Sequence, residues 1–326
     1  MGEFDLIARH FTRAPHGAWP SQGVGDDCAL IDVPGLRLAV SCDMLIAGRH
    51  FFPDDEPESI GHKALAVNLS DLAAAGAAPR ACFLALGLPE ADEAWLARFA
   101  AGLHALADAH GCPLLGGDTT RTPQLAQGAG PLTLSLTVLG ELPPGVGLTR
   151  AGARPGDELW VSGELGDAAL ALAARTGAVA LAADALAAVR ARLERPQPRV
   201  ALGRALLGLA TSAIDVSDGL AADLGHVLAR SGVGASLHWL AVPRSASLRA
   251  QPEVLQRECA LAGGDDYELL FTAPPRQRDA VVAAARSAGV AVSRIGTIRA
   301  EPGLEILDDA GARIELARRG YDHFAS

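Results

Sequence analysis

The sequence predicts an α/β protein built from two domains. Its 326 residues are enough for two ordinary hydrophobic cores, and a hydrophobic fraction of 49% is typical of a globular chain. Expected strands and helices alternate along the first half. Residues 141–147 contain two prolines and two glycines, which indicates a linker. We therefore expect an N-terminal domain over residues 1–146 and a C-terminal domain over residues 147–326.

Hydrophobic periodicity predicts the elements of the first half. Leu65, Leu69 and Leu72 recur at helical spacing and predict a helix over residues 58–75. Apolar residues alternate with Thr and Ser over residues 132–138, which predicts a strand. The other elements expected here are helices over 3–11 and 92–110, strands over 36–41 and 81–88, and a short strand ending at 117–118.

The second half continues the mixture of strands and helices. We expect Asp218 to cap a helix whose start favours a bound anion. The expected elements are strands over 158–162, 235–240 and 290–295, helices over 167–195 (broken near 177), 199–210, 218–231 and 276–288, and a hairpin of 304–307 with 313–316.

Composition excludes several classes of function. The net charge is −10 without a basic block, so nucleic acid and anionic membranes are poor partners. Five cysteines without a CxxC pair fit a reducing compartment. The first residues do not resemble a secretory signal, and the longest apolar region, 168–189, is interrupted by charged residues and glycine. We expect a cytoplasmic protein.

The chain has a single lysine, Lys63, in the context His-Lys-Ala. A Walker A loop requires Gly-Lys-Ser/Thr, and a protein kinase requires a lysine on a strand. Neither pattern is present, and there is no GxGxxG segment. The two commonest nucleotide-binding folds are therefore disfavoured.

Aspartates at expected strand ends are the main functional signal. They lie at 26–27, 41–43, 116–118 and 215–218, mostly beside glycine. Two carboxylates about 4 Å apart repel by roughly 4 kcal/mol at an effective dielectric near 20, so a cluster needs a cation or a proton. Oxygen ligands suit Mg²⁺, Mn²⁺ or Ca²⁺. Alone, each motif is also consistent with a turn or a helix cap.

The aspartate motifs belong to a longer ordered set of segments. These are Gly2 to Ile7, Gly25 to Ala29, His50-Phe51, Lys63 to Leu72, Gly116 to Thr120, Ala213 to Asp215, Ser217 to Leu220, Asp266 to Leu269 and Gly320 to Phe324. In this order they closely resemble the thiamine-monophosphate kinase family, whose superfamily includes aminoimidazole ribonucleotide synthetase and selenophosphate synthetase. The resemblance covers nearly the whole chain.

The resemblance implies a set of site residues. Magnesium ions would be held by Asp27, Ser41, Cys42, Asp43, Asp71, Asp118, Asp215 and Asp218. ATP would contact Gly117, Asp118, Arg150 and Ser217, and thiamine monophosphate would contact His50, Asp265 and Tyr321. Two positions depart from the family. Cys42 stands where Thr is common, so a backbone carbonyl would replace a hydroxyl ligand, and Asp265 stands where Glu is frequent, which shortens the carboxylate's reach.

The resemblance also implies an architecture and an activity. The two α/β domains would be of the aminoimidazole-ribonucleotide-synthetase type, with N-terminal strands pairing across a homodimer and the active site between the domains. The reaction would be phosphorylation of thiamine monophosphate by ATP, assisted by several Mg²⁺ ions and without a general base. Another ATP-dependent synthetase of the superfamily, or a non-enzymatic protein that binds divalent metal or nucleotide, remains an alternative.

Overall fold

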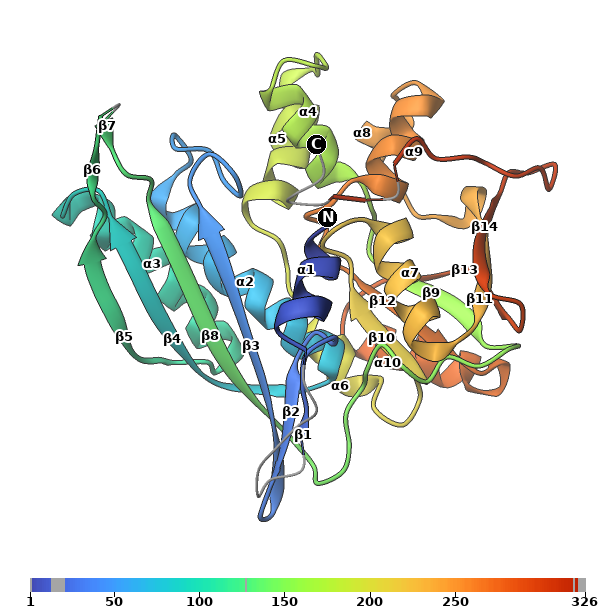
Figure 1. Ribbon diagram of the computed structural model, residues 1–326. Coiled ribbons are helices and arrows are strands. Elements are labelled where there is room, and N and C mark those ends of the chain that lie inside the picture. Colours follow the sequence, from blue (N-terminus) through green and yellow to red (C-terminus); the bar gives the residue numbers. More distant parts are fainter. Residues whose placement is uncertain (1, 13–20, 127, 319, 322–326) are drawn as a thin grey trace.

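The computed structural model describes residues 2–12, 21–126, 128–318 and 320–321 and has two α/β halves, as Figure 1 shows. One six-stranded sheet is built from residues 21 to 142, and another from residues 158 to 307. The predicted α/β class with two domains is confirmed, while the boundary at residues 146 and 147 stays a prediction. Residues 322–324 of the tail motif lie outside the described residues. Within the described ranges, no helix combines the length and the apolar character needed to cross a membrane.

The first sheet has the strand order β1-β2-β3-β8-β4-β5. Its neighbours are antiparallel except β4 and β5, which are parallel. The elements of this half are α1 (Glu3–His10), β1 (Ser21–Gln22), β2 (Ala29–Val33), β3 (Leu36–Ile46), α2 (Pro57–Ala75), β4 (Ala78–Leu88), α3 (Glu93–His110), β5 (Leu114–Arg121), β6 (Gln124–Leu125), β7 (Gly128–Ala129) and β8 (Thr133–Leu142).

The second sheet has the order β10-β12-β9-β13-β11-β14, and only β11 and β14 are parallel neighbours. The elements of this half are β9 (Glu158–Ser162), α4 (Asp167–Arg175), α5 (Ala183–Glu194), α6 (Val200–Ala205), β10 (Ser212–Asp215), α7 (Leu220–Ser231), β11 (Gly234–His238), η1 (Trp239–Ala241), α8 (Ala246–Arg249), α9 (Glu253–Ala262), β12 (Leu269–Ala273), η2 (Pro275–Gln277), α10 (Arg278–Ser287), β13 (Val292–Arg299) and β14 (Gly303–Leu307).

The predicted hairpin of 304–307 with 313–316 forms in part. Its first segment is β14, which pairs with β11. Its second segment is not a strand, but it makes an antiparallel bridge between Leu307 and Arg313, and the backbone N–H of Ile314 donates to the carbonyl oxygen of Ile306 at 2.8 Å. Three further elements, β2, α9 and β12, were not predicted from the sequence.

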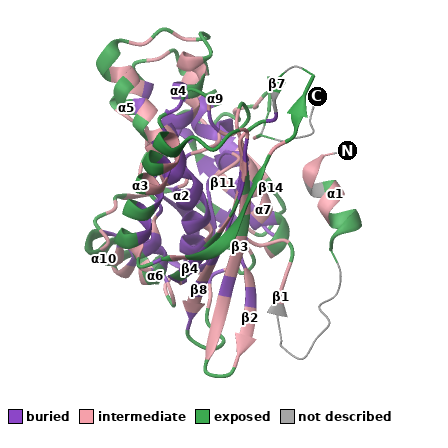
Figure 2. Ribbon diagram, turned by 90° about the vertical axis from the view of Figure 1, so that its left-hand side faces the viewer, coloured by how far each residue is buried: buried purple, intermediate pink, exposed green. Residues whose placement is uncertain are grey.

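Helix α2 is the centre of the molecule. It is buried on nearly all sides (Figure 2), and it contacts β3, β8 and α3 of its own half and α6 and β10 of the other. A helix that is apolar all round requires neighbours on every side. Both halves therefore pack on this helix, and its polar residues can reach both of them.

Two glycines allow α2 and α3 to pack closely. A Cβ atom added at Gly61 would lie 2.1 Å from the carbonyl oxygen of Phe99, and one added at Gly102 would lie 2.0 Å from that of Glu58. The helix backbones are thus in direct contact at these positions. A side chain at either would push the two helices apart.

We expect Gly102→Ala to lower the free energy of unfolding by about 1–3 kcal/mol, because the new methyl group overlaps backbone that cannot rotate away. Gly225→Ala on α7 is the matched control. A Cβ atom there meets nothing within 4 Å, so Ala should stabilise the helix by about 0.5–1 kcal/mol. Chemical denaturation of both variants measures this difference, and equal stabilities would contradict the close contact between α2 and α3.

Candidate active site

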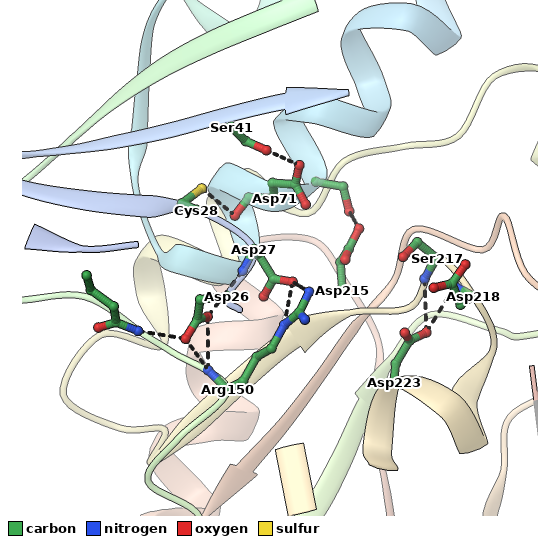
Figure 3. Close-up of polar contacts among 12 residues, drawn as sticks. Asp26, Asp27, Cys28, Ser41, Asp71, Arg150, Asp215, Ser217, Asp218 and Asp223 are labelled. Atoms are coloured by element: carbon green, nitrogen blue, oxygen red, sulfur yellow. Dashed lines mark hydrogen bonds and ion pairs between the residues drawn. The ribbon is translucent and has the colours of Figure 1, made fainter. Parts of the chain in front are cut away.

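Three carboxylates from distant parts of the chain converge between the two halves. Asp27 precedes β2, Asp71 lies on α2 and Asp215 ends β10, and one oxygen of each lies within 4.8 Å of the others (Figure 3). Asp27 and Asp215 are buried and Asp71 is half-buried. The structure thus brings together three of the aspartates expected to bind metal. We call these three residues the acidic cluster.

Helix α2 fixes the cluster through hydrogen bonds to strands of both sheets. The Ser41 hydroxyl on β3 donates to the Asp71 carboxylate at 2.5 Å. The Ser70 hydroxyl donates to Asp215 at 2.7 Å. The backbone N–H of Asp43 donates to the Asn68 side chain at 3.0 Å, which sets β3 against the helix. Neighbouring positions of one helix therefore orient carboxylates from both halves.

Arg150 lies beside the cluster. Its guanidinium donates to Asp27 Oδ1 from Nη2 at 2.6 Å and from Nε at 3.1 Å, and its backbone N–H donates to Asp26 at 3.1 Å (Figure 3). Arg150 follows the linker, so this contact joins the start of the second half to the first acidic motif. One cation thus faces several buried carboxylates.

Burial and mutual repulsion both disfavour ionised carboxylates here. Burial, reinforced by the charge of Asp27, raises the pKa of Asp43 to about 6 and the pKa of Asp215 to about 8. Burial, then the charges of Asp43 and Asp215, raises the pKa of Asp71 well above its ordinary value. Full ionisation at neutral pH therefore requires more positive charge than Arg150 supplies. A set of hard oxygen donors of this kind fits Mg²⁺.

The start of α7 differs from the prediction. Asp218 does not cap the helix. The backbone N–H groups of Ser217, Asp218 and Gly219 all donate to the Asp223 carboxylate at 3.1–3.2 Å. Asp223 thus occupies the place expected for an anion, and those three donors are already used. The predicted cap is therefore wrong, while the anion site expected at this helix start stays a prediction.

The three residues expected to bind the acceptor substrate lie along contacts that join the two halves. His50 Nδ1 accepts a hydrogen bond from the backbone of Ile46 at 3.0 Å. The Lys63 ammonium joins the His50 carbonyl oxygen, at 3.0 Å, to the Asp265 carboxylate, at 3.1 Å. Arg49 lies over the Tyr321 ring with its guanidinium carbon 5.1 Å from the ring centroid.

Asp118 lies apart from the acidic cluster. Asp43 is opposite Leu136, then Leu84, then Gly117 across the sheet, a separation of about 14 Å for three strand spacings. Asp118 follows Gly117, so its side chain points to the opposite face of the sheet. That face also carries the Cys42 thiol, which lies 3.3 Å from the Ser135 hydroxyl. Within one chain, these two side chains do not join the cluster.

Sequence reasoning missed several residues that build the site. Ser70 and Asp223 position Asp215 and the loop before α7, and Tyr267 donates its hydroxyl to Asp265 at 3.0 Å. Lys63 was used only to exclude other nucleotide-binding folds and as part of a segment that carries the family resemblance, and no role in the site was assigned to it. A signal was present for Lys63 and Ser70, because polar residues inside an otherwise apolar helix require buried partners.

Comparison with known proteins first identifies the class of protein to which the chain belongs. Residues 25–142 match the family model of the AIR synthase related protein N-terminal domain, and residues 154–309 match the model of its C-terminal domain. The two-sheet fold with an acidic cluster between its halves is therefore that of an AIR synthase related protein. Full-length relatives then narrow the assignment.

Thiamine-monophosphate kinase of Escherichia coli (strain K12) is 46% identical over 332 residues, covering 100% of this chain and 99% of the relative. The crystal structure of thiamine-monophosphate kinase from Stenotrophomonas maltophilia K279a is 44% identical, with a TM-score of 0.79 over 95% of this chain and 96% of that one. A structure described as AaThiL complexed with AMPPCP and TMP is 29% identical, with a TM-score of 0.82 over 99% and 97%. The chain belongs to the thiamine-monophosphate kinase family.

The raised pKa of Asp215 predicts how stability depends on pH when divalent cations are chelated. Its pKa is about 8 in the folded protein against an ordinary value of 3.8, so between these values the folded protein keeps a proton that the unfolded chain has lost. This group therefore makes the free energy of unfolding fall as pH rises.

We expect Asp215→Asn to have a higher melting temperature than the wild type at pH 8 in EDTA, because the variant has no charge to bury. The difference should shrink toward pH 5. Thermal unfolding across this range measures it, with Asp108→Asn on α3, outside the cluster, as the control. A variant no more stable than the wild type at pH 8 would show that Asp215 causes no electrostatic destabilisation.

Proposed function

We propose that this chain transfers the γ-phosphoryl group of ATP to thiamine monophosphate and forms thiamine diphosphate. The observation that carries the proposal is the acidic cluster, assembled from both halves in a member of the thiamine-monophosphate kinase family. The solved relative with AMPPCP and TMP supports the same pair of substrates. The cytoplasmic location remains part of this proposal.

We assign the site residues on this basis. Asp27, Asp43, Asp71, Asp215 and Asp218, with Ser41 and the backbone of Cys42, hold the cations. Bound Mg²⁺ would supply positive charge to the phosphate oxygens, which a protein with a net charge of −10 otherwise repels. Arg150 and Ser217 contact ATP. The 2.6 Å hydrogen bond from Arg150 to Asp27 holds the guanidinium beside the cation site, where it can also donate to a phosphate oxygen.

The acceptor needs no general base. A phosphate monoester has a second pKa near 6, so its oxygens are largely ionised at pH 7 and can attack phosphorus in line. We assign His50 to this substrate. Because its Nδ1 accepts from Ile46, the neutral ring carries its proton on Nε2, which is a hydrogen-bond donor for a phosphate. The Asp265 carboxylate and the Tyr321 ring would attract the cationic thiazolium. The same ring binds a cation within the chain, because the Arg49 guanidinium lies over it.

A second copy of the chain supplies Asp118 and Gly117 in this proposal. Asp118 lies on the face of the first sheet that helix α2 does not cover, together with Met44, which is 56% exposed, and Phe83, which is 39% exposed. Exposed apolar side chains on a sheet face are typical of an interface between copies. A homodimer through this face would carry Asp118 of one protomer toward the site of its partner.

A coupled ADP assay with ATP, Mg²⁺ and thiamine monophosphate tests the activity. We expect turnover that depends on all three, and we expect Asp43→Asn to lower kcat by at least about a hundredfold with an unchanged far-UV spectrum. ADP release without thiamine monophosphate would favour another synthetase of the superfamily. No ADP release would favour a protein that only binds metal or nucleotide.

Mixed dimers test the origin of Asp118. Asp118→Asn and Asp215→Asn chains, each inactive alone, are co-expressed with different affinity tags, and the mixed dimer is purified through both tags. If Asp118 acts on the partner's site, one of the two sites is complete and activity returns to about half that of the wild type. If Asp118 acts within its own chain, both sites are defective and the mixed dimer is inactive.

A further inference from the structure

Lys63 is a buried cation that the mechanism above does not use. Its side chain is 4% exposed, and it is the only lysine in the chain. Burying an ammonium group is unfavourable unless hydrogen bonds and an opposite charge compensate it. The ammonium donates to the His50 carbonyl oxygen at 3.0 Å and to Asp265 Oδ2 at 3.1 Å. Both partners belong to residues that we assign to the acceptor substrate.

These partners belong to different halves of the molecule. His50 follows β3, whereas Asp265 lies between α9 and β12, 202 residues from Lys63. Lys63 on α2 thus joins the two halves beside the residues that we assign to the acceptor substrate. The length of its side chain sets how far apart the His50 backbone and the Asp265 carboxylate lie.

The loop that carries Asp265 has an unusual backbone. Asp265 has φ 67° and Tyr267 has φ 51°, values that residues with side chains rarely adopt. The surrounding contacts must hold such a conformation. The backbone N–H of Asp265 donates a hydrogen bond to the carbonyl oxygen of Ser217, and that of Tyr267 donates to Val216, each at 2.8 Å. These two hydrogen bonds hold the loop in place. The Tyr267 hydroxyl and Lys63 then each hold one oxygen of the Asp265 carboxylate.

We propose that Lys63 is a positioning residue for the acceptor substrate, which it affects by fixing the Asp265 carboxylate relative to the His50 loop. This inference rests on the proposed function and adds a residue to it. A simple neutralising role would have the opposite effect on binding. Removing a positive charge beside Asp265 would strengthen the attraction for a cationic thiazolium, whereas loss of positioning weakens the contact.

Steady-state kinetics of Lys63→Met distinguish the two roles. We expect the KM for thiamine monophosphate to rise about tenfold while the KM for ATP changes less than about twofold. Lys63→Arg keeps the charge and the donors and should recover part of the loss. The matched control is Arg195→Met. Arg195 also joins the halves, but its 3.0 Å hydrogen bond is to Ser59, which is not one of the residues that we assign to a substrate, so its effect should be on stability alone.

A double-mutant cycle then tests the route of action. If Lys63 acts through Asp265, Lys63→Met should add less than about twofold to the KM of Asp265→Ala. Independent, multiplying effects would overturn the proposal. An unchanged or lower KM for thiamine monophosphate in Lys63→Met, or an equal rise in the KM for both substrates, would also overturn the proposal. A wild-type protein inactive with thiamine monophosphate would instead refute the proposed function.

The single lysine permits a test on the unaltered protein, which also covers a Lys63→Met variant that does not fold. In protein labelled with ¹⁵N-lysine, one ammonium signal reports the contacts of Lys63. We expect thiamine monophosphate to shift this signal and a non-hydrolysable ATP analogue alone to leave it nearly unchanged. A signal that does not respond to saturating thiamine monophosphate would overturn the positioning role.

Discussion

The burial of polar side chains on α2 determines how the two halves of the molecule pack. Lys63, Asn68 and Ser70 are buried on a helix that both halves cover, and a buried polar group left without a partner costs about 1–3 kcal/mol. Their partners are the His50 and Asp265 loops, the backbone of β3 and the end of β10. Helix α2 therefore fixes the site as well as the core. Its buried polar side chains find hydrogen-bond partners only when the segments that carry the site residues lie beside the helix.

The acidic cluster, in contrast, lowers the stability of the folded protein. Buried carboxylates within 4.8 Å of one another lower stability whenever they are ionised, and Arg150 compensates only part of their charge. The Asp27–Arg150 contact also joins the start of the second half to the first, so the residue that compensates part of the charge also holds the two halves together. A site that destabilises its own protein but is completed by ligand is a common compromise between stability and activity.

Sequence predicted the features that depend on local pattern. The apolar period around Leu65 predicted α2, which carries Asp71, and Gly25 beside Asp26 predicted the bend that carries Asp27. Strand β12 was missed because a run of five residues buried on both faces has no alternation to distinguish it from a helix. The side of the sheet on which Asp118 lies depends on register across four strands, and the use of the α7 start by Asp223 depends on loop geometry. Both are tertiary properties that no local pattern contains.

The loop at Asp265 shows how such tertiary contacts alter the meaning of a single residue. The family resemblance leads one to expect glutamate there, with a longer reach. Aspartate, however, is among the residues that tolerate a positive φ best, and the backbone at this position has φ 67°. The shorter side chain thus suits the conformation of the loop, and Lys63 and Tyr267 hold its carboxylate from both sides. The position of the charge is then set less by the length of the side chain at 265 than by the neighbours that α2 and the loop itself supply.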